Sequence, residues 1–379
     1  MAAPTVTPVG TWTSAGALTT AAAWYGQHDG PVQLESGAVV VAGGADATGQ
    51  SVPDSAVFEH DQWHPTTGNL GTPRRLHTLT RLANGKILAV GGLNGSAAVE
   101  SAELFDPGTG RWTPTGSLDK GRWGHTATLL EDDSVLVTGG SAVRPGGGVV
   151  ALRSAERFVD GEWQPAKEMT DARTAHTAIQ LATGFVLVVG GVAPVGAVDD
   201  PALAFCELYD PDHDTWAPTG NLVHGRRHHR ATLLSGGAVI VTGGTAPGSP
   251  GAAPFDPFSQ RTVERFDPAT GTWTEKKPMP SGRAFHRAVA LPHDQLLVVG
   301  GAASDRDESG FRSALVYDAV GNEWSSAPGL REGRWSFGAL ALADDRILVV
   351  GGVARSGLAA ADPGTTELLA TAELFGETA

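Results

Sequence analysis

A pair of adjacent glycines recurs seven times along this 379-residue chain, each time directly after a four-residue apolar run such as VVVA or ILVV. After each of the first six pairs comes an aromatic residue and, five or seven residues later, a tryptophan. A repeat of 48 to 57 residues with this content predicts a toroid of four-stranded sheets. The glycine pairs are Gly43-Gly44, Gly91-Gly92, Gly139-Gly140, Gly190-Gly191, Gly243-Gly244, Gly300-Gly301 and Gly351-Gly352.

The seventh repeat lacks its final strand, because no tryptophan follows Phe375. A matching segment stands at the other end of the chain, where residues 10–13 (GTWT) repeat residues 271–274. We therefore expect the segment around Trp12 to supply the outer strand of the last blade, which leaves no unpaired strand edge there. The prediction is an all-β single domain over residues 1–379, with blades at about 21–70, 71–118, 119–169, 170–222, 223–279, 280–330, and 331–379 plus 5–18.

Composition narrows the partners and the compartment. A formal net charge of -14 argues against nucleic acid or an anionic membrane as the main partner. No apolar run approaches the ~20 residues of a membrane span, and the N-terminus lacks the pattern of a signal peptide. The single cysteine, Cys206, excludes an internal disulfide framework. We expect a cytoplasmic protein, and the abundance of Ala, Gly and Val over Lys suggests a bacterial one.

The repeat also explains many polar residues as architecture. The glycine pairs allow close approach of neighbouring sheets, and the aromatic residues and tryptophans fill the wedges between blades. Glutamates recur on the third strands too regularly for catalysis, so we expect them to pair with arginines of a neighbouring blade. These glutamates are Glu103, Glu156, Glu207, Glu264 and Glu373.

The double glycine, the Glu-x-aromatic-Asp segment (residues 264–267) and the spaced tryptophan resemble the Kelch-repeat family over essentially the whole chain. The resemblance implies a seven-bladed β-propeller. Its functional face would carry the loops between second and third strands and the connections between blades. Three of those loops are long and irregular here, at residues 141–153, 245–261 and 353–371. Long loops on a rigid scaffold are where binding residues concentrate.

A histidine stands fourteen residues before each glycine pair in repeats two to six, and an arginine stands three residues before each histidine. Repeat one has Asp29 at the counted position, with His28 beside it, and repeat seven has Phe337. Neutral imidazoles that meet near the axis would bind a transition metal. The candidate metal ligands are His77, His125, His176, His229 and His286.

Copper is favoured as the metal, with iron and zinc as alternatives, because the copper radical oxidases similar to galactose oxidase carry a ligating histidine at this strand position. Their mechanism is not expected, since the residues before these histidines include no tyrosine to match theirs. A second interpretation stays open. Arg-x-x-His is common among bacterial Kelch repeats, where the pair can hydrogen-bond neighbouring blades without any metal.

Repeats seven and one, which are adjacent in a closed ring, interrupt the histidine pattern with aromatic residues. We expect this gap to bind an organic ligand, with Asp29 or His28 as the catalytic group. The alternative is that the aromatic residues pack the seam between first and last blades. The candidate substrate-binding residues are Trp24, Tyr25, Trp123, Trp335 and Phe337.

The function predicted first is a metal-dependent enzyme that acts on a small organic substrate at the centre of the loop face, in a setting such as bacterial specialised metabolism. A protein-binding Kelch scaffold is the second hypothesis. Such adaptors usually carry a further module, for which this chain has no residues left. A metal-free isomerase similar to the Kelch-type sialic acid mutarotases is the third.

Overall fold

The structure is a computed structural model that describes residues 10–26, 28, 30–193, 202–246, 259–304 and 308–376. Every regular element within these ranges is a β-strand. Accordingly, no helix among the described residues has the length and apolar character needed to cross a membrane.

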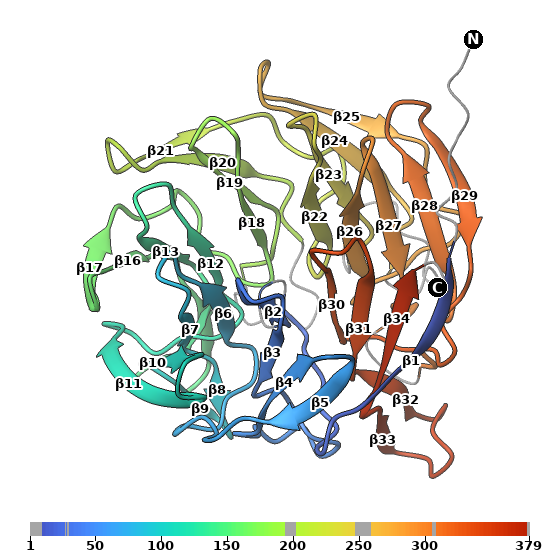
Figure 1. Ribbon diagram of the computed structural model, residues 1–379. Coiled ribbons are helices and arrows are strands. Elements are labelled where there is room, and N and C mark those ends of the chain that lie inside the picture. The colour runs from blue at the N-terminus through green and yellow to red at the C-terminus, as the bar shows by residue number, and fades with distance from the viewer. Residues whose placement is uncertain are drawn as a thin grey trace.

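The described strands form seven four-stranded antiparallel sheets, arranged as blades around a central axis (Figure 1). This arrangement confirms the predicted seven-bladed β-propeller. Blades one to three consist of β2 (Val32–Gln33), β3 (Val39–Ala42), β4 (Ser55–Glu59) and β5 (Gln62–Pro65); β6 (Thr78–Arg81), β7 (Ile87–Val90), β10 (Ser101–Asp106) and β11 (Arg111–Ser117); and β12 (Thr126–Leu129), β13 (Val135–Thr138), β16 (Ala155–Val159) and β17 (Glu162–Ala166).

The next three blades repeat the same order from the axis outward. They consist of β18 (Thr177–Gln180), β19 (Val186–Val189), β20 (Cys206–Asp210) and β21 (Thr215–Pro218); β22 (Arg230–Leu233), β23 (Val239–Thr242), β24 (Val263–Asp267) and β25 (Thr272–Lys276); and β26 (Arg287–Leu291), β27 (Gln295–Val299), β28 (Ala314–Asp318) and β29 (Glu323–Ala327).

The seventh blade joins the two ends of the chain, as predicted. It contains β30 (Gly338–Ala341), β31 (Ile347–Val350), β34 (Thr371–Gly376) and, as its outer strand, β1 (Thr11–Ala17). Trp12 pairs with Phe375 in the antiparallel register of β1 and β34, and their ring centroids lie 5.1 Å apart. The indole Nε1 of Trp12 donates to the carbonyl oxygen of Pro328 at 2.8 Å, which ties blade seven to blade six.

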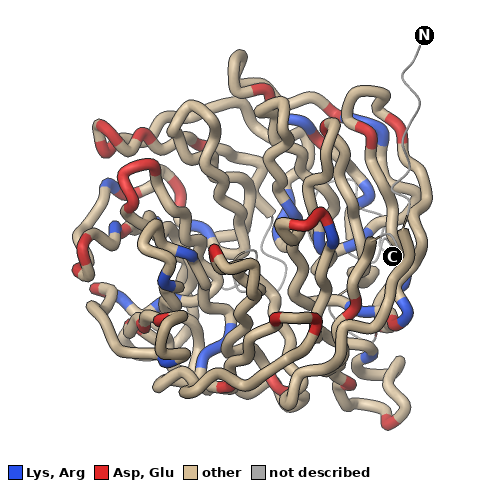
Figure 2. The backbone as a smooth tube through the Cα atoms, viewed as in Figure 1, with Lys and Arg blue, Asp and Glu red and all other residues tan. Residues whose placement is uncertain are grey.

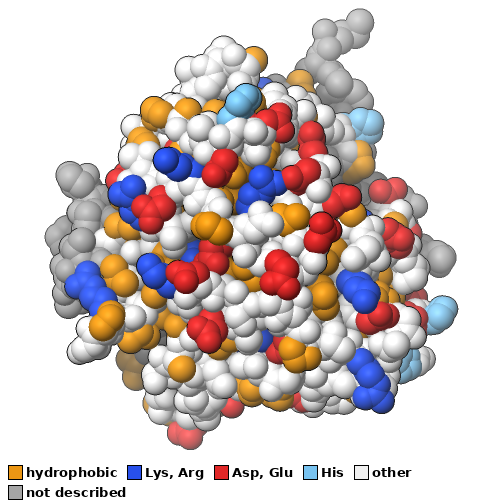
Figure 3. Space-filling model, turned by 90° about the vertical axis from the view of Figure 1, so that its left-hand side faces the viewer, with side chains coloured by type: hydrophobic (Ala, Val, Ile, Leu, Met, Phe, Trp, Pro, Cys, Tyr) orange, Lys and Arg blue, Asp and Glu red, His pale blue; other side chains and the backbone are white. Residues whose placement is uncertain are grey.

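Three two-stranded hairpins extend the connections between second and third strands. They are β8 (Leu93–Asn94) with β9 (Ala97–Ala98), β14 (Ser141–Val143) with β15 (Val149–Ala151), and β32 (Val353–Gly357) with β33 (Thr365–Leu368). Aspartate and glutamate residues are spread around the ring rather than gathered in one stretch of the backbone (Figure 2). The outer wall seen in Figure 3 likewise mixes acidic, basic and apolar side chains.

In five blades the arginine before the first strand is buried and pairs with a glutamate of its own blade, which corrects the expected pairing between blades. Arg283 of blade six is also buried, but it donates to the carbonyl oxygens of Gly300 and Ser313. Arg226 and Glu264, for example, approach to 2.6 Å with both side chains fully buried. Arg226 also donates to the carbonyl oxygens of Gly243 and Thr262. One guanidinium thus fastens the blade's entry to its second and third strands. The same pairing joins Arg74 to Glu103, Arg122 to Glu156, Arg173 to Glu207 and Arg334 to Glu373.

Candidate functional site: an axial cavity on the loop face

The five predicted metal-ligand histidines lie in separate slots between neighbouring blades. The ring of His125, for example, packs against Gly91 of the preceding blade, where an added Cβ would come within 2.8 Å of its Cε1. Gly91 also has a φ of +62°, so both its conformation and the imidazole require a glycine. In the same slots, Nε2 bonds a threonine hydroxyl of the preceding blade for His125 (Thr78), His176 (Thr126), His229 (Thr177) and His286 (Thr242).

These contacts do not fit a metal centre. Among the described residues, no group of three or more His, Cys, Asp or Glu side chains is placed to hold a metal ion. The Nε2 atoms that would coordinate the metal are mostly engaged with threonine, and the Nδ1 atoms of all five histidines are buried without a partner. The expected convergence of imidazoles into a metal site is therefore not found among the described residues. The histidines pack the blade interfaces, and His125, His176 and His229 also line the axial cavity described below.

Burial keeps these imidazoles neutral. It lowers the pKa of His77 to about 3, and the guanidinium of Arg74 lowers it further. For His125 and His176 burial is again the main cause, followed by the arginine three residues earlier, and the pKa falls well below the usual range.

Blade one departs from the repeat by four inserted residues. In blades two to seven an isolated antiparallel β-bridge joins the residue before the first strand to a residue eighteen positions later, as in Arg75 with Leu93. In blade one the corresponding β-bridge joins Ala23 with Ala45, which are four positions further apart. Trp24 consequently fills the slot that histidine fills elsewhere, with its ring against Gly351 of blade seven. This corrects the equivalence of Asp29 with the histidines, because counting back from the glycine pair assumed constant spacing.

The inserted segment crosses the axial channel and is held by two arginines from the far side. Arg230 and Arg287 donate to the carbonyl oxygen of Gly26 at 2.9 and 2.7 Å. Arg287 also donates to the carbonyl oxygen of Trp24 at 2.9 Å, and His28 accepts from the backbone N–H of Leu79 at 2.8 Å. Segments of blades two, five and six therefore fasten the insertion of blade one.

This crossing divides the channel into two cavities. On the loop side lies a cavity of about 330 Å³, which we call the axial cavity, lined by Tyr25 and Gly26 and by the entry segments of blades two to five. On the other side is a cavity of about 180 Å³, whose walls include His28, Leu79 and Ala339 from positions further along the first strands. The insertion forms the floor of the axial cavity.

The axial cavity combines basic, aromatic and hydroxyl groups. Its lining includes Trp123 from the entry of blade three and Thr174 from the entry of blade four. Blade five contributes Arg227, His228 and Arg230. The imidazole of His228 stacks on Phe285 with centroids 4.5 Å apart. Burial, then Arg227 and Arg230, lower its pKa to about 3, so it is a neutral group in a basic setting.

Two of the five predicted substrate-binding residues line the axial cavity, and the other three are buried between blades. Tyr25 and Trp123 line the axial cavity, as a ligand-binding role requires. Trp24, Trp335 and Phe337 are 2%, 3% and 0% exposed, respectively. Phe337 occupies the interblade slot against Gly300, and Trp335 packs edge-on against Tyr25 at 6.0 Å. Phe337 thus packs between blades six and seven, and Trp335 packs beside Tyr25, so the expected ligand-facing wall of Trp335 and Phe337 is interior packing.

Of the two predicted catalytic residues, the structure describes only His28, which does not line the axial cavity. Asp29 lies outside the described residues. His28 lines the smaller cavity beyond the insertion, where burial and the nearby Arg230 and Arg287 lower its pKa to about 4.

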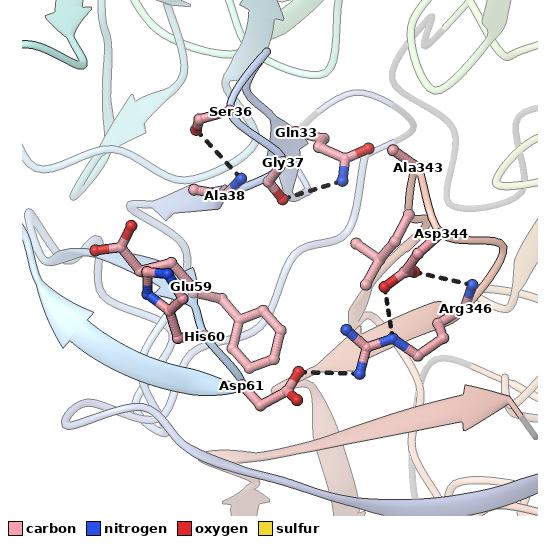
Figure 4. Close-up of a pocket in the computed structure, with 12 residues that line it drawn as sticks. Gln33, Ser36, Gly37, Ala38, Glu59, His60, Asp61, Ala343, Asp344 and Arg346 are labelled. Carbon is pink, nitrogen blue, oxygen red and sulfur yellow. Dashed lines mark hydrogen bonds and ion pairs between the residues drawn. The ribbon is translucent and has the colours of Figure 1, made fainter. Parts of the chain in front are cut away.

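A groove of about 570 Å³ lies at the opposite face, between blades seven and one (Figure 4). Arg346 spans it, donating to Asp61 at 2.9 Å and to Asp344 at 2.8 Å. Its other lining residues include the exposed Ser36, Glu59 and His60 and the buried Ala38, Phe58 and Leu342. The Arg346–Asp61 ion pair links the last and first blades, and the groove has the character of an open surface rather than an enclosed site.

Sequence reasoning missed the basic groups of the channel, although the repeat carries a signal for them. Repeats two to four have threonine after the slot histidine, whereas repeats five and six have Arg230 and Arg287. Repeat five alone places a histidine, His228, at the preceding position. Residues that depart from an otherwise regular repeat are not required for the fold of the blade, so they are candidates for function.

Comparison with known proteins agrees with the fold. Residues 74–118 and 226–280 match the Kelch motif. The chain is 26% identical over 255 residues to Kelch-like protein 34 of Homo sapiens, covering 66% of this chain and 29% of that protein. It is 27% identical over 280 residues to Beta-scruin of Limulus polyphemus, covering 70% and 29%. This chain therefore spans less than a third of either relative. Together with the seven blades, these matches support a Kelch-repeat β-propeller.

Among solved structures, the fold resembles a fungal alcohol oxidase described as a member of the AA5 family in complex with copper. The TM-score is 0.68 at 15% identity, covering 97% of this chain and 76% of that one. At this identity the likeness concerns the fold alone.

Proposed function

We propose that this propeller is an enzyme that binds a small organic molecule in the axial cavity and acts on it there. The observation that carries the proposal is the inserted floor: a chain segment closes the channel at Gly26, and two arginines fix it. The loop-side end of the channel is therefore a closed-bottomed cavity, the axial cavity, of about 330 Å³, at the lower end of the size range of small-molecule sites.

The side chains that line the axial cavity favour a reaction catalysed by amino-acid groups rather than by a metal ion. His228 is neutral and can accept a proton, and Arg227 and Arg230 can hold or stabilise negative charge. Of the functions weighed from the sequence, a metal-free reaction of the isomerase type suits this set of groups best. The slot histidines do not support the copper-dependent alternative, because they lie in separate interblade slots.

The test is a thermal-shift screen of small organic molecules, repeated with Trp123→Ala. We expect compounds that stabilise the parent protein to lose that effect in Trp123→Ala, because its indole lines the axial cavity. Trp216→Ala is the matched control, since Trp216 lies on the outer strand of blade four, with its Nε1 bonded to Lys167. Equal loss in both variants, or no loss in Trp123→Ala, would contradict the proposal.

A protein-binding function is the second candidate, and one observation favours it. Val143 and Val149, on the β14–β15 hairpin beside the axial cavity, are 47% and 48% exposed. A partner that docks over the loop face would cover them. Val143→Ser with Val149→Ser would then reduce capture of that partner and leave small-molecule binding unchanged.

A further inference from the structure

Blade six departs from its neighbours at one buried ion pair. In blades two to five and seven, the arginine before the first strand pairs with a third-strand glutamate, and the backbone N–H three residues before that arginine donates to the same carboxylate. In blade six the glutamate position is Leu315, which has the register on β28 that Glu264 has on β24. The residue three before Arg283 is Pro280, which has no N–H to donate. Blade six has therefore lost both the carboxylate and its donor, whereas the arginine remains.

Arg283 is a buried cation with no carboxylate partner among the described residues. It is 1% exposed, and its Nη1 donates to the carbonyl oxygens of Gly300 and Ser313 at 2.9 and 3.3 Å. In the described part of the chain, its Nη2 bonds only the hydroxyls of Ser281 and Ser313, at 3.4 and 3.1 Å, and its Nε has no partner. Burial lowers the pKa of Arg283 to about 10, so the guanidinium stays charged at neutral pH. A buried charge without a partner is strongly unfavourable, so an anion that pairs with it stabilises the fold.

The surroundings of Arg283 offer hydrogen-bond donors and a route from solvent, but no negative charge. Ser281 and Ser313 are exposed, so Nη2 lies directly below the surface, and both hydroxyls can donate to an anion. The same Nη2 atom binds a glutamate oxygen at 2.6 to 3.1 Å in the five other blades. The ring of Phe311 lies 5.5 Å from the guanidinium carbon, and Leu315 belongs to the apolar cluster between blades five and six. A ring face stabilises a cation less than a carboxylate does, so the guanidinium still lacks a counter-ion.

We infer that Arg283 is the centre of a binding site for a small monovalent anion, chloride in ordinary solution, which neutralises the guanidinium as a glutamate does in five other blades. The anion accepts from Nη2 of Arg283 and from the hydroxyls of Ser281 and Ser313. A monatomic ion suits this place, because the guanidinium is 1% exposed and a larger anion would need the surface to open. Arg283 does not line the axial cavity, so this inference is independent of the proposed function.

The experiment is thermal unfolding of the full chain in mixtures of sodium chloride and sodium gluconate at one fixed ionic strength, which keeps general charge screening constant. Raising chloride from about 1 mM to about 150 mM should raise the midpoint by about 2 °C, for a dissociation constant of about 10 mM. Leu315→Glu supplies the missing carboxylate, so it should raise the midpoint at low chloride and abolish the chloride dependence. Val320→Glu is the charge-matched control, because Val320 is 81% exposed on a turn of the same blade, and it should keep the dependence.

The place of the ion is located by anomalous diffraction from crystals of the full chain in which bromide replaces chloride. We expect a bromide peak beside Nη2 of Arg283 in the parent and in Val320→Glu, and none there in Leu315→Glu. Ser313→Ala is the second variant if Leu315→Glu fails to fold, because Ser313 is exposed and only its hydroxyl is removed. It should raise the chloride concentration that gives half of the stabilisation by about fivefold, the strength of one hydrogen bond.

Three results would overturn the anion site. The first is a midpoint that does not change with chloride at fixed ionic strength. The second is a chloride dependence that persists in Leu315→Glu, because the ion would then act elsewhere. The third is a bromide peak beside Arg283 without a chloride-dependent midpoint, which would show an adventitious ion only. None of these results bears on the axial cavity, which the compound screen tests separately.

Discussion

Removing the indole of Trp12 is expected to destabilise the ring at its point of closure. Trp12 is 7% exposed, packs on Phe375 at 5.1 Å, and donates to the carbonyl oxygen of Pro328 at 2.8 Å. Truncating a buried tryptophan to alanine costs about 3–5 kcal/mol. Leaving the Pro328 carbonyl unpaired adds about 1 kcal/mol. Trp12→Ala should therefore lower the free energy of unfolding by about 4–6 kcal/mol.

The assay is equilibrium urea unfolding followed by circular dichroism, with linear extrapolation to water. Thr13→Ala is the control, because Thr13 lies on the same strand with its side chain exposed, and it should change the free energy by less than about 0.5 kcal/mol. A loss below about 1 kcal/mol in Trp12→Ala would refute the closure of the ring by β1. Deleting residues 1–18 should destabilise the protein at least as much as Trp12→Ala.

Three further predictions concern the buried polar groups. Arg226→Ala should lower the free energy of unfolding by about 3–5 kcal/mol, because it leaves Glu264 buried without its counter-ion; a loss near zero in urea unfolding would contradict this. The pKa of His77 is about 3 in the folded protein and ordinary in the unfolded chain, so its stabilising contribution is present above pH 6.5 and is lost as the pH falls towards 3. Urea unfolding at several pH values should show a loss of about 1.4 kcal/mol per pH unit from this group, and His77→Gln should flatten the profile by that amount. His125→Ala with His176→Ala should lower stability and leave the metal content found by elemental analysis equal to that of the parent; metal lost only in the variant would restore the metal-ligand interpretation.

The repeat made the fold predictable. Seven glycine pairs after apolar runs, each followed by spaced aromatic residues, leave one economical way to bury every run, and the stray Trp12 segment indicated how the ring closes. These features depend on local spacing and burial, which a sequence displays directly.

The site was harder to predict because its geometry depends on where the repeat fails. Counting back fourteen residues from Gly43 gives Asp29, which would be the slot residue only if blade one had the standard spacing. Blade one has four extra residues, and Trp24 occupies the slot instead. The same insertion brings Gly26 beside Arg230 from blade five, a contact between residues 204 positions apart. Repetition also made the histidines look like a converging set, whereas each one serves its own interface.

The most direct test of a small-molecule site in the axial cavity is a crystallographic fragment screen of the full chain. We expect fragments to bind between Tyr25 and Trp123, in contact with Arg227 or His228. Fragments found only in the groove spanned by Arg346, or only at the outer wall of the blades, would contradict it.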